Sequence, residues 1–278
     1  MGRYPFQTLG WHRDLPDPRD YVPDHERVAP LLGALVPQEL PPSHLDWCEY
    51  CPEPENQAPL AGSSAHACVS LVQYFHRRAT GEIIDPSRLF AYYTARRLMN
   101  WTGDTGAGLR ITWKAVARFG LPPEEHWPSD FASLDSSPDC FAFASANRMP
   151  RPIYVRLDTP GKRGKATLQT VRSFLAAGFP SVFGFSVCSS ISAAADIPSP
   201  TVFDRCLGGQ AAVAVGYDDQ HWVRSDKGAL LILNSWGPQW GENGFGWLPY
   251  SYVHEHLAVD FWTVFHPDWL DSGEFARP

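Results

Sequence analysis

The chain has 278 residues, of which 44% are hydrophobic and 19% are charged, and no apolar run approaches the roughly 20 residues that a membrane helix needs. Its 30 acidic and 23 basic side chains give a formal net charge of −7, whereas nucleic acid attracts clustered Lys and Arg. We therefore expect a globular protein with a large enclosed core, and neither nucleic acid nor a membrane as its partner.

The amino-terminal sequence has no apolar signal core, so we expect a cytoplasmic protein with reduced cysteines. Cys48 and Cys51 form a CxxC pair, which is typical of half a zinc site, but no second pair with matching spacing follows. We interpret them as loop thiols and expect no metal and no other cofactor. Nothing in the sequence indicates an oligomeric state.

Residues 1–45 are rich in proline and charged side chains and show no sustained periodicity. This composition predicts an extended arm that packs on the body of the protein. From Ser63 the pattern becomes helical and apolar on most faces, until Gly81 ends it. A helix that is apolar nearly all round is expected to be a central one.

Pro86 predicts the start of a second helix, since proline suits the first turn. A third helix is predicted over residues 109–119 and is followed by Gly120. Residues 46–158 are therefore predicted to form a helical lobe.

Residues 159–278 are predicted to form a β lobe, after one more helix at about 168–177. Short β-prone runs separated by Gly, Pro and Asp lie at residues 181–187, 211–217, 230–233 and 261–265. Helices first and strands afterwards predict an α+β chain. We expect the two lobes to form one domain and to meet in a cleft, the usual place for a ligand.

A loop marked by proline and glycine, residues 57–62, runs directly into the first predicted helix. The first turn of a helix has unpaired N–H groups and a partial positive charge, which stabilise an attacking anion and the oxyanion that it creates. A nucleophile suits such a position. The residue there is a serine, Ser63.

Five stretches in the same order resemble papain-like cysteine peptidases, particularly their bacterial cytosolic branch. Residues 57–67 resemble the motif Q-G-x-L-G-S-C-x-A-x-A, residues 208–219 resemble G-G-H-A-V-x-A-V-G-Y-D-D, and residues 233–241 resemble R-N-S-W-G-x-x-W-G. Residues 244–250 and 260–264 continue the similarity. The resemblance implies a papain-like two-lobe fold, with a central helix in the helical lobe and an antiparallel, barrel-like β lobe.

The resemblance places the family's catalytic cysteine at Ser63 and its catalytic histidine at Gln210. Ser63 follows Gln57 by six residues, which is the family spacing from the oxyanion-hole glutamine to the nucleophile, so Ser64 is the weaker candidate. The resemblance further implies that Gln57 and the Ser63 N–H would form the oxyanion hole. Asn234 would orient the missing base.

Three further positions take a role from the resemblance. Trp236 would shield the contact between Asn234 and the base. Gly106 and its neighbour Ala107 fall where the family presents a glycine edge to a bound peptide, although a simple turn before the third helix is an alternative interpretation. His66 is the histidine closest in sequence to Ser63, but the resemblance implies Asn or His there in active family members beside a complete dyad. We therefore favour a buried, hydrogen-bonded structural role for it.

The two replacements remove the proton chemistry of the family. A serine hydroxyl is barely ionised near neutral pH without a base, and glutamine has no titrating group. Loss of a triad member reduces the rate by several powers of ten. We predict a catalytically degenerate homologue, a pseudo-peptidase that binds a peptide or peptide-like molecule in the interlobe cleft.

An alternative hypothesis is an enzyme of altered chemistry that performs acyl transfer or amide formation on an activated substrate. It would use the oxyanion hole of Gln57, with or without Ser63. An engineered Cys-to-Ser replacement would explain Ser63 alone, but not Gln210.

Overall fold

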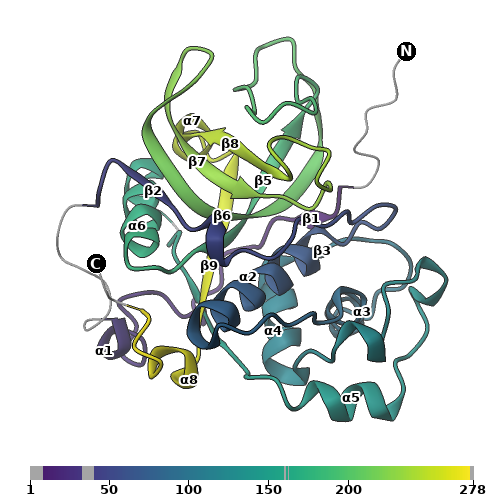
Figure 1. The fold of residues 1–278 in the computed structure, drawn as a ribbon. Coiled ribbons are helices and arrows are strands. Elements are labelled where there is room, and N and C mark those ends of the chain that lie inside the picture. Colours follow the sequence, from purple (N-terminus) through teal and green to yellow (C-terminus); the bar gives the residue numbers. More distant parts are fainter. Residues whose placement is uncertain (1–8, 33–40, 160, 162, 276–278) are drawn as a thin grey trace.

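The computed structural model describes residues 9–32, 41–159, 161 and 163–275. Two groups of elements meet along one long helix, with most of the helices on one side and an antiparallel sheet on the other (Figure 1). This arrangement is the predicted α+β fold with two lobes. None of the described helices is both long and apolar enough to cross a membrane.

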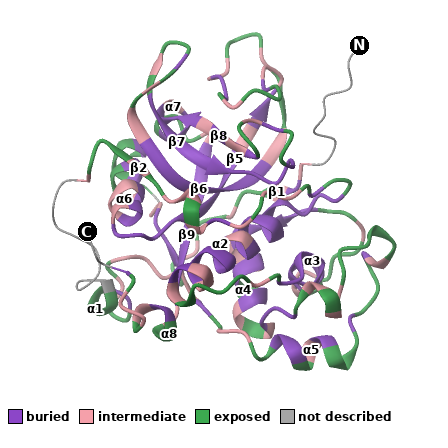
Figure 2. Ribbon diagram, in the orientation of Figure 1, coloured by how far each residue is buried: buried purple, intermediate pink, exposed green. Residues whose placement is uncertain are grey.

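The central helix is α2 (Ser63–Thr80), which begins at the predicted serine. It ends at Gly81, whose φ of 76° is a left-handed conformation that glycine adopts without steric cost. Most of α2 is buried (Figure 2), because it packs on strands of the sheet and on the helices α3 (Arg88–Leu98), α4 (Leu109–Phe119) and α8 (Pro267–Leu270). The all-round apolar pattern of this segment therefore predicted its central position correctly.

The other helices of this lobe lie near α2. The second predicted helix begins after Ser87 rather than at Pro86, because the Ser87 hydroxyl accepts a hydrogen bond from the Phe90 N–H at 3.1 Å and so caps the first turn. The lobe contains α3 (Arg88–Leu98), α4 (Leu109–Phe119), α5 (Cys140–Ala146) and the 3-10 turns η1 (Cys48–Tyr50), η2 (Glu124–His126) and η3 (Phe131–Ser133). The sequence analysis predicted α4 correctly and missed α5.

The sheet has seven strands, in the order β4-β9-β5-β6-β7-β8 with β2 paired to β6, and every pairing is antiparallel. Its strands are β2 (His44–Asp46), β4 (Ile153–Arg156), β5 (Ser181–Cys188), β6 (Cys206–Val223), β7 (Asp226–Leu233), β8 (Phe245–Pro249) and β9 (Ala258–Phe265). The four predicted runs are all strands, but β6 is much longer than expected. β4 joins the sheet although its residues fall within the predicted helical lobe. The division of the chain into lobes at residue 158 stays a prediction.

Short helices accompany the sheet and the chain ends. They are α1 (Ala29–Leu32), α6 (Gly164–Ala176), α7 (Tyr250–His254) and α8 (Pro267–Leu270). The predicted helix at 168–177 is α6, which begins four residues earlier than expected.

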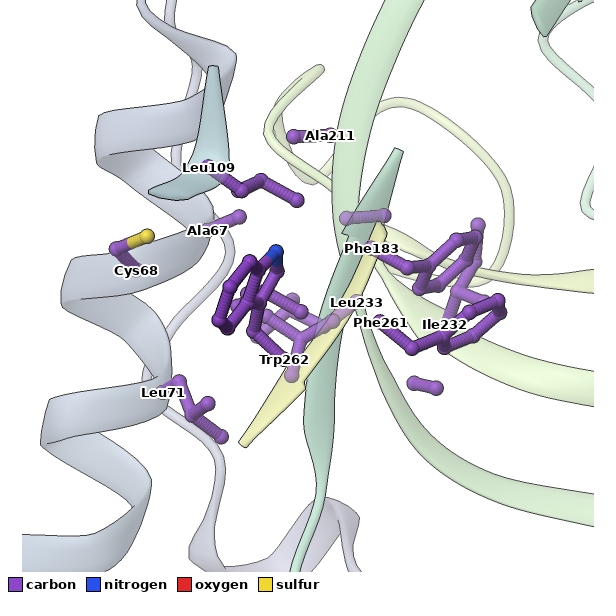
Figure 3. Packing of buried hydrophobic residues seen from close by; sticks show 14 of the residues in the cluster. Ala67, Cys68, Leu71, Leu109, Phe183, Ala211, Ile232, Leu233, Phe261 and Trp262 are labelled. Atoms are coloured by element: carbon purple, nitrogen blue, oxygen red, sulfur yellow. The ribbon is translucent and has the colours of Figure 1, made fainter. Parts of the chain in front are cut away.

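The core between α2 and the sheet is built around Trp262 of β9, which is fully buried. Figure 3 shows Trp262 beside Ala67 of α2, while Phe183 and Phe261 lie on the opposite side of the strands. The rings of Phe183 and Phe261 stack with their centroids 4.7 Å apart. Both faces of the sheet are thus packed, which fixes the start of α2 relative to β6.

The described part of the amino-terminal arm lies on this body. Its strand β1 (Trp11–His12) pairs in parallel with β3 (Ala107–Gly108), directly before α4. Further along, the Tyr21 carbonyl accepts a hydrogen bond from the N–H of Arg156 in β4 at 2.8 Å. The rest of the predicted arm, residues 1–8 and 33–40, lies outside the described residues.

Candidate functional site

Ser63 is the first residue of α2 and is fully buried, with 0% of its surface exposed. Among the described residues, its hydroxyl has no hydrogen-bond partner. The neighbouring Ser64 hydroxyl instead donates to the Ala107 carbonyl at 2.6 Å. The two serine hydroxyls therefore differ in their contacts, whereas the assignment of Ser63 to the nucleophile position stays a prediction.

Gln210 lies in β6 and is also fully buried. Its Nε2 lies 2.8 Å from Gln57 Oε1, 2.9 Å from Asn234 Oδ1 and 3.1 Å from Ser235 Oγ. These three contacts share two N–H groups, since a carboxamide nitrogen carries only two hydrogens. The structure thus brings together three predicted site residues from separate parts of the chain.

Ser235 is a member of this network that the sequence analysis missed. Its hydroxyl donates to Gln57 Oε1 at 2.5 Å, and its backbone carbonyl accepts from the Gln57 N–H at 2.9 Å. The available signal was its place next to Asn234 in the Asn-Ser-Trp motif. Gln57 Nε2 donates to the Leu60 carbonyl at 3.2 Å, in the loop that leads to Ser63.

Trp236 follows this network and is buried beside it. Its ring lies edge-on to Trp240 at a centroid distance of 5.1 Å and approaches Phe185 at 6.3 Å. Its backbone forms an isolated bridge with Asn56, next to Gln57. The Trp236 ring therefore packs against other aromatic side chains, and its role as a shield stays a prediction.

The described contacts offer Ser63 no base. Neither the Ser63 hydroxyl nor Gln210 Oε1 has a hydrogen-bond partner among the described residues, and the amides of Gln57, Gln210 and Asn234 do not titrate. The chemistry of the site is therefore that of hydrogen-bonding amides.

His66 is buried as predicted, but its Nδ1 has no hydrogen-bond partner in the part of the chain that the structure describes. The predicted hydrogen bond is therefore not found at this atom, which lies 3.9 Å from Glu55 Oε2. Burial, with a smaller effect of the Arg88 charge, lowers the pKa of His66 to about 3. The imidazole is accordingly neutral near pH 7.

The predicted glycine edge is already paired with the chain's own arm. The Ala107 N–H donates to the Gly10 carbonyl at 2.8 Å, and Trp11 lies opposite Ala107 in the β1–β3 pairing. Gly106 has a φ of 74°, and a Cβ at this position would lie 2.3 Å from the Gly10 carbonyl oxygen. Only glycine fits there because any side chain would collide with the arm.

Trp11 lies on bare backbone of the sheet next to Gln210. A Cβ at Gly209 would lie 2.5 Å from Trp11 Cε3, and a Cβ at Gly184 of β5 would lie 1.8 Å from Trp11 Cε2. On the other side, a Cβ at Gly10 would lie 1.7 Å from the carbonyl oxygen of Ala61, two residues before Ser63. The arm therefore passes between the start of α2 and the strands β5 and β6, a placement that sequence reasoning did not foresee.

The arm is held by polar contacts after Trp11. His12 Nε2 donates to the Thr105 carbonyl at 2.6 Å, the Asp14 N–H donates to Asp260 Oδ2 at 2.7 Å, and the Arg110 N–H donates to Asp14 Oδ2 at 2.9 Å. Burial first, and then the charge of Asp14, raise the pKa of Asp260 to about 7. The anchoring point of the arm thus contains a carboxyl group that titrates near neutrality.

The described residues contain no cluster of three or more His, Cys, Asp or Glu side chains that could hold a metal ion. Cys48 and Cys51 lie at the η1 turn. A hydrogen bond with Cys51, followed by burial, raises the pKa of Cys48. These two thiols are therefore poor sources of thiolate ligands.

Comparisons with known proteins agree with this geometry, although no family model matches the sequence. The chain is 34% identical over 187 residues to an uncharacterized peptidase C1-like protein of Acanthamoeba polyphaga mimivirus, a match that covers 64% of this chain and 58% of the viral protein. Less than two thirds of that relative is therefore represented here.

Two solved structures resemble the whole chain. Xylellain, a cysteine protease from Xylella fastidiosa, superposes with a TM-score of 0.75 at 27% identity, over 96% of this chain and 98% of xylellain. A digestive procathepsin from the larval midgut of Tenebrio molitor superposes with a TM-score of 0.71 at 17% identity, over 94% of this chain and 78% of its own. The chain thus has the papain-like two-lobe fold, and it is similar to a viral peptidase C1-like protein and to a bacterial cysteine protease.

Proposed function

We propose that this chain is a catalytically degenerate papain-like peptidase homologue, a pseudo-peptidase, whose interlobe cleft binds an extended peptide. The observation that carries the proposal is the pairing of β1 with β3, in which the chain's own arm lies extended along the glycine edge. The Ala107 N–H and the bare backbone at Gly106 make this edge a peptide acceptor. A backbone edge that binds one extended segment can bind another of similar shape, because main-chain hydrogen bonds supply the recognition.

The lack of proteolysis is inferred from the amide network. Proteolysis needs a group that takes the proton of the nucleophile and returns it to the leaving amine. Gln210 can do neither, and its Nε2 is held by acceptors on Gln57, Asn234 and Ser235. The site is thus suited to hydrogen bonding rather than to proton transfer.

Binding can be tested with a fluorescent peptide of the sequence of residues 9–14 and full-length protein. Trp11→Ala should free the cleft, so the peptide should bind this variant at least tenfold more tightly than the wild type in fluorescence anisotropy. Leu15→Ala, at a side chain that is 79% exposed, is the matched control and should behave like the wild type. Equal binding by all three proteins, or binding by none of them, contradicts the proposal. So does peptide hydrolysis by the pure protein that Ser63→Ala abolishes.

A second candidate is acyl transfer from an activated ester or thioester, which needs less help from a base than an amide does. It is favoured by the unengaged Ser63 hydroxyl and by the presence of Gln57 beside the loop that leads to it. Gln57 Nε2 and the Ser63 N–H would then stabilise the oxyanion. If Gln57→Ala and Ser63→Ala leave the turnover of activated acyl donors unchanged, this candidate is excluded.

A further inference from the structure

Two cysteines lie opposite each other where β5 ends and β6 begins. Cys188 and Cys206 are Cα partners in the antiparallel ladder, across a register shift that follows Val187. The neighbouring Ser189 N–H donates to the Arg205 carbonyl at 2.9 Å, so this hydrogen bond flanks the cysteine pair instead of joining it. Such non-hydrogen-bonded pairs have the shorter Cα separation, about 4.5 Å, which falls within the range that a disulfide spans.

The two thiols differ in accessibility. Cys206 is exposed, whereas Cys188 is buried at 5% exposure, and both are free thiols in this structure. Burial raises the pKa of Cys188, and the nearby Cys206 and Asp204 act in the same direction. An oxidant therefore meets Cys206 first, and Cys188 is positioned to react second.

We propose that Cys188 and Cys206 are a redox-active pair that forms an intrachain disulfide on reaction with a low-molecular-weight disulfide such as oxidised glutathione. The Cys206 thiolate attacks one sulfur of the oxidant, which forms a mixed disulfide and releases one glutathione thiolate. Cys188 then gives its proton to solvent and attacks the Cys206 sulfur, which releases the second glutathione. Two protein thiols are oxidised by two electrons, and one glutathione disulfide is reduced to two thiols.

The bond would close a ring around the loop of residues 189–205. This loop carries Val202 and Phe203, which are more than nine-tenths exposed. Two residues after Cys206, a Cβ at Gly208 would lie 3.0 Å from Leu9 Cδ1, so β6 touches the arm next to the proposed bridge. Oxidation would thus fix the end of the sheet on which the arm rests, and this inference does not depend on the proposed peptide binding.

The test is oxidation of the full-length protein with glutathione disulfide, followed by alkylation under denaturing conditions and peptide mapping. We expect two of the six thiols to disappear, the intact mass to fall by about 2 Da, and one linked peptide to join Cys188 to Cys206. The melting temperature should rise and should return to its initial value with dithiothreitol.

Variants separate the two steps of the reaction. Cys188→Ser should stop at a stable glutathione adduct on Cys206, about 305 Da heavier. In Cys206→Ser the remaining Cys188 thiol should stay unmodified. Cys140→Ser, at an exposed cysteine outside the pair, should form the bridge like the wild type. A bridge between Cys48 and Cys51 alone, or a glutathione adduct on Cys206 that persists in the wild type, would overturn the proposal. The mapping of the wild type decides the question even if a variant fails to fold.

Discussion

Gln210 Nε2 donates a hydrogen bond to Gln57 Oε1 over 2.8 Å, which joins the position expected for a base to the position expected for an oxyanion donor. Asn234 Oδ1 accepts from the same nitrogen at 2.9 Å, so it orients an amide in the way it was expected to orient a base. Since none of these groups titrates, the network keeps its charge and its hydrogen bonds at every pH at which the protein is folded. The hydrogen bonds of this network therefore do not depend on a titrating group.

Restoring the two reacting groups should restore reactivity. We expect Ser63→Cys combined with Gln210→His to react with a thiol-directed, peptide-based epoxide probe, because Gln57 and Asn234 are already in place. Adding Trp11→Ala should accelerate labelling by about tenfold or more, since the arm then no longer competes for the cleft. Mass spectrometry measures the modification and its site.

The wild type and Ser63→Cys alone are the controls for this labelling, because they report on the six native cysteines and on a thiol without a base. If the folded triple variant remains unlabelled at residue 63, the cleft does not retain a peptidase-like geometry.

Gly209→Ala should expel the arm. Its Cβ would lie 2.5 Å from Trp11 Cε3 and 2.8 Å from the Trp11 carbonyl oxygen, a collision that typically costs 1–3 kcal/mol. We expect trypsin to cleave after Arg13 about tenfold faster in this variant, because the state in which the arm is detached from the sheet becomes more populated. Leu15→Ala is the control, and equal cleavage rates in both variants would show that Trp11 does not hold the arm.

Asp260 should make the fold less stable as the pH rises. Burial first, and then the charge of Asp14, raise its pKa from 3.8 to about 7, so the folded state binds more protons than the unfolded state between these values. The free energy of unfolding should therefore fall as the pH rises through this window. Asp260→Asn retains a side-chain oxygen that can accept from the Asp14 N–H. Its free energy of unfolding, measured with urea near pH 5 and pH 8, should depend less on pH than that of the wild type.

The ion pair with Arg156, 2.6 Å from Asp260, opposes this effect because it favours the charged carboxylate. If the variant loses stability equally at both pH values, the ion pair outweighs burial and the predicted slope is wrong.

His66 should make the fold less stable as the pH falls, which is the opposite of the effect of Asp260. Its pKa is lowered from 6.5 to about 3, chiefly by burial, so the unfolded state takes up a proton that the folded state refuses. The corresponding stability is present above pH 6.5 and is lost as the pH falls toward 3. His66→Asn should reduce this acid sensitivity in thermal unfolding. The imidazole signal that this variant removes should not titrate between pH 5 and 8 in NMR spectra, and a midpoint near 6.5 would contradict the assignment.

Part of the molecule was predictable because its signals are local. The first turn of α2 and its end at Gly81 follow from glycine and from the apolar pattern, and α4 begins and ends at its predicted residues. The start of α3 was misplaced because the Ser87 side chain decides it, and α5 was missed because it has too few residues for a periodic pattern.

The sequence by itself determined the fold, because the fold follows from residue types in ordered motifs. The same motifs predict that Ser63 and Gln210 replace the reacting groups, which stays a prediction. Only the tertiary structure placed Ser235 in the amide network and Trp11 against the glycines of β5 and β6. The reason is physical: the Trp11 contacts join the arm to backbone that is distant in sequence, and they depend on missing side chains at glycines. A sequence pattern shows which residues are small, but only the fold shows what occupies the space that they leave.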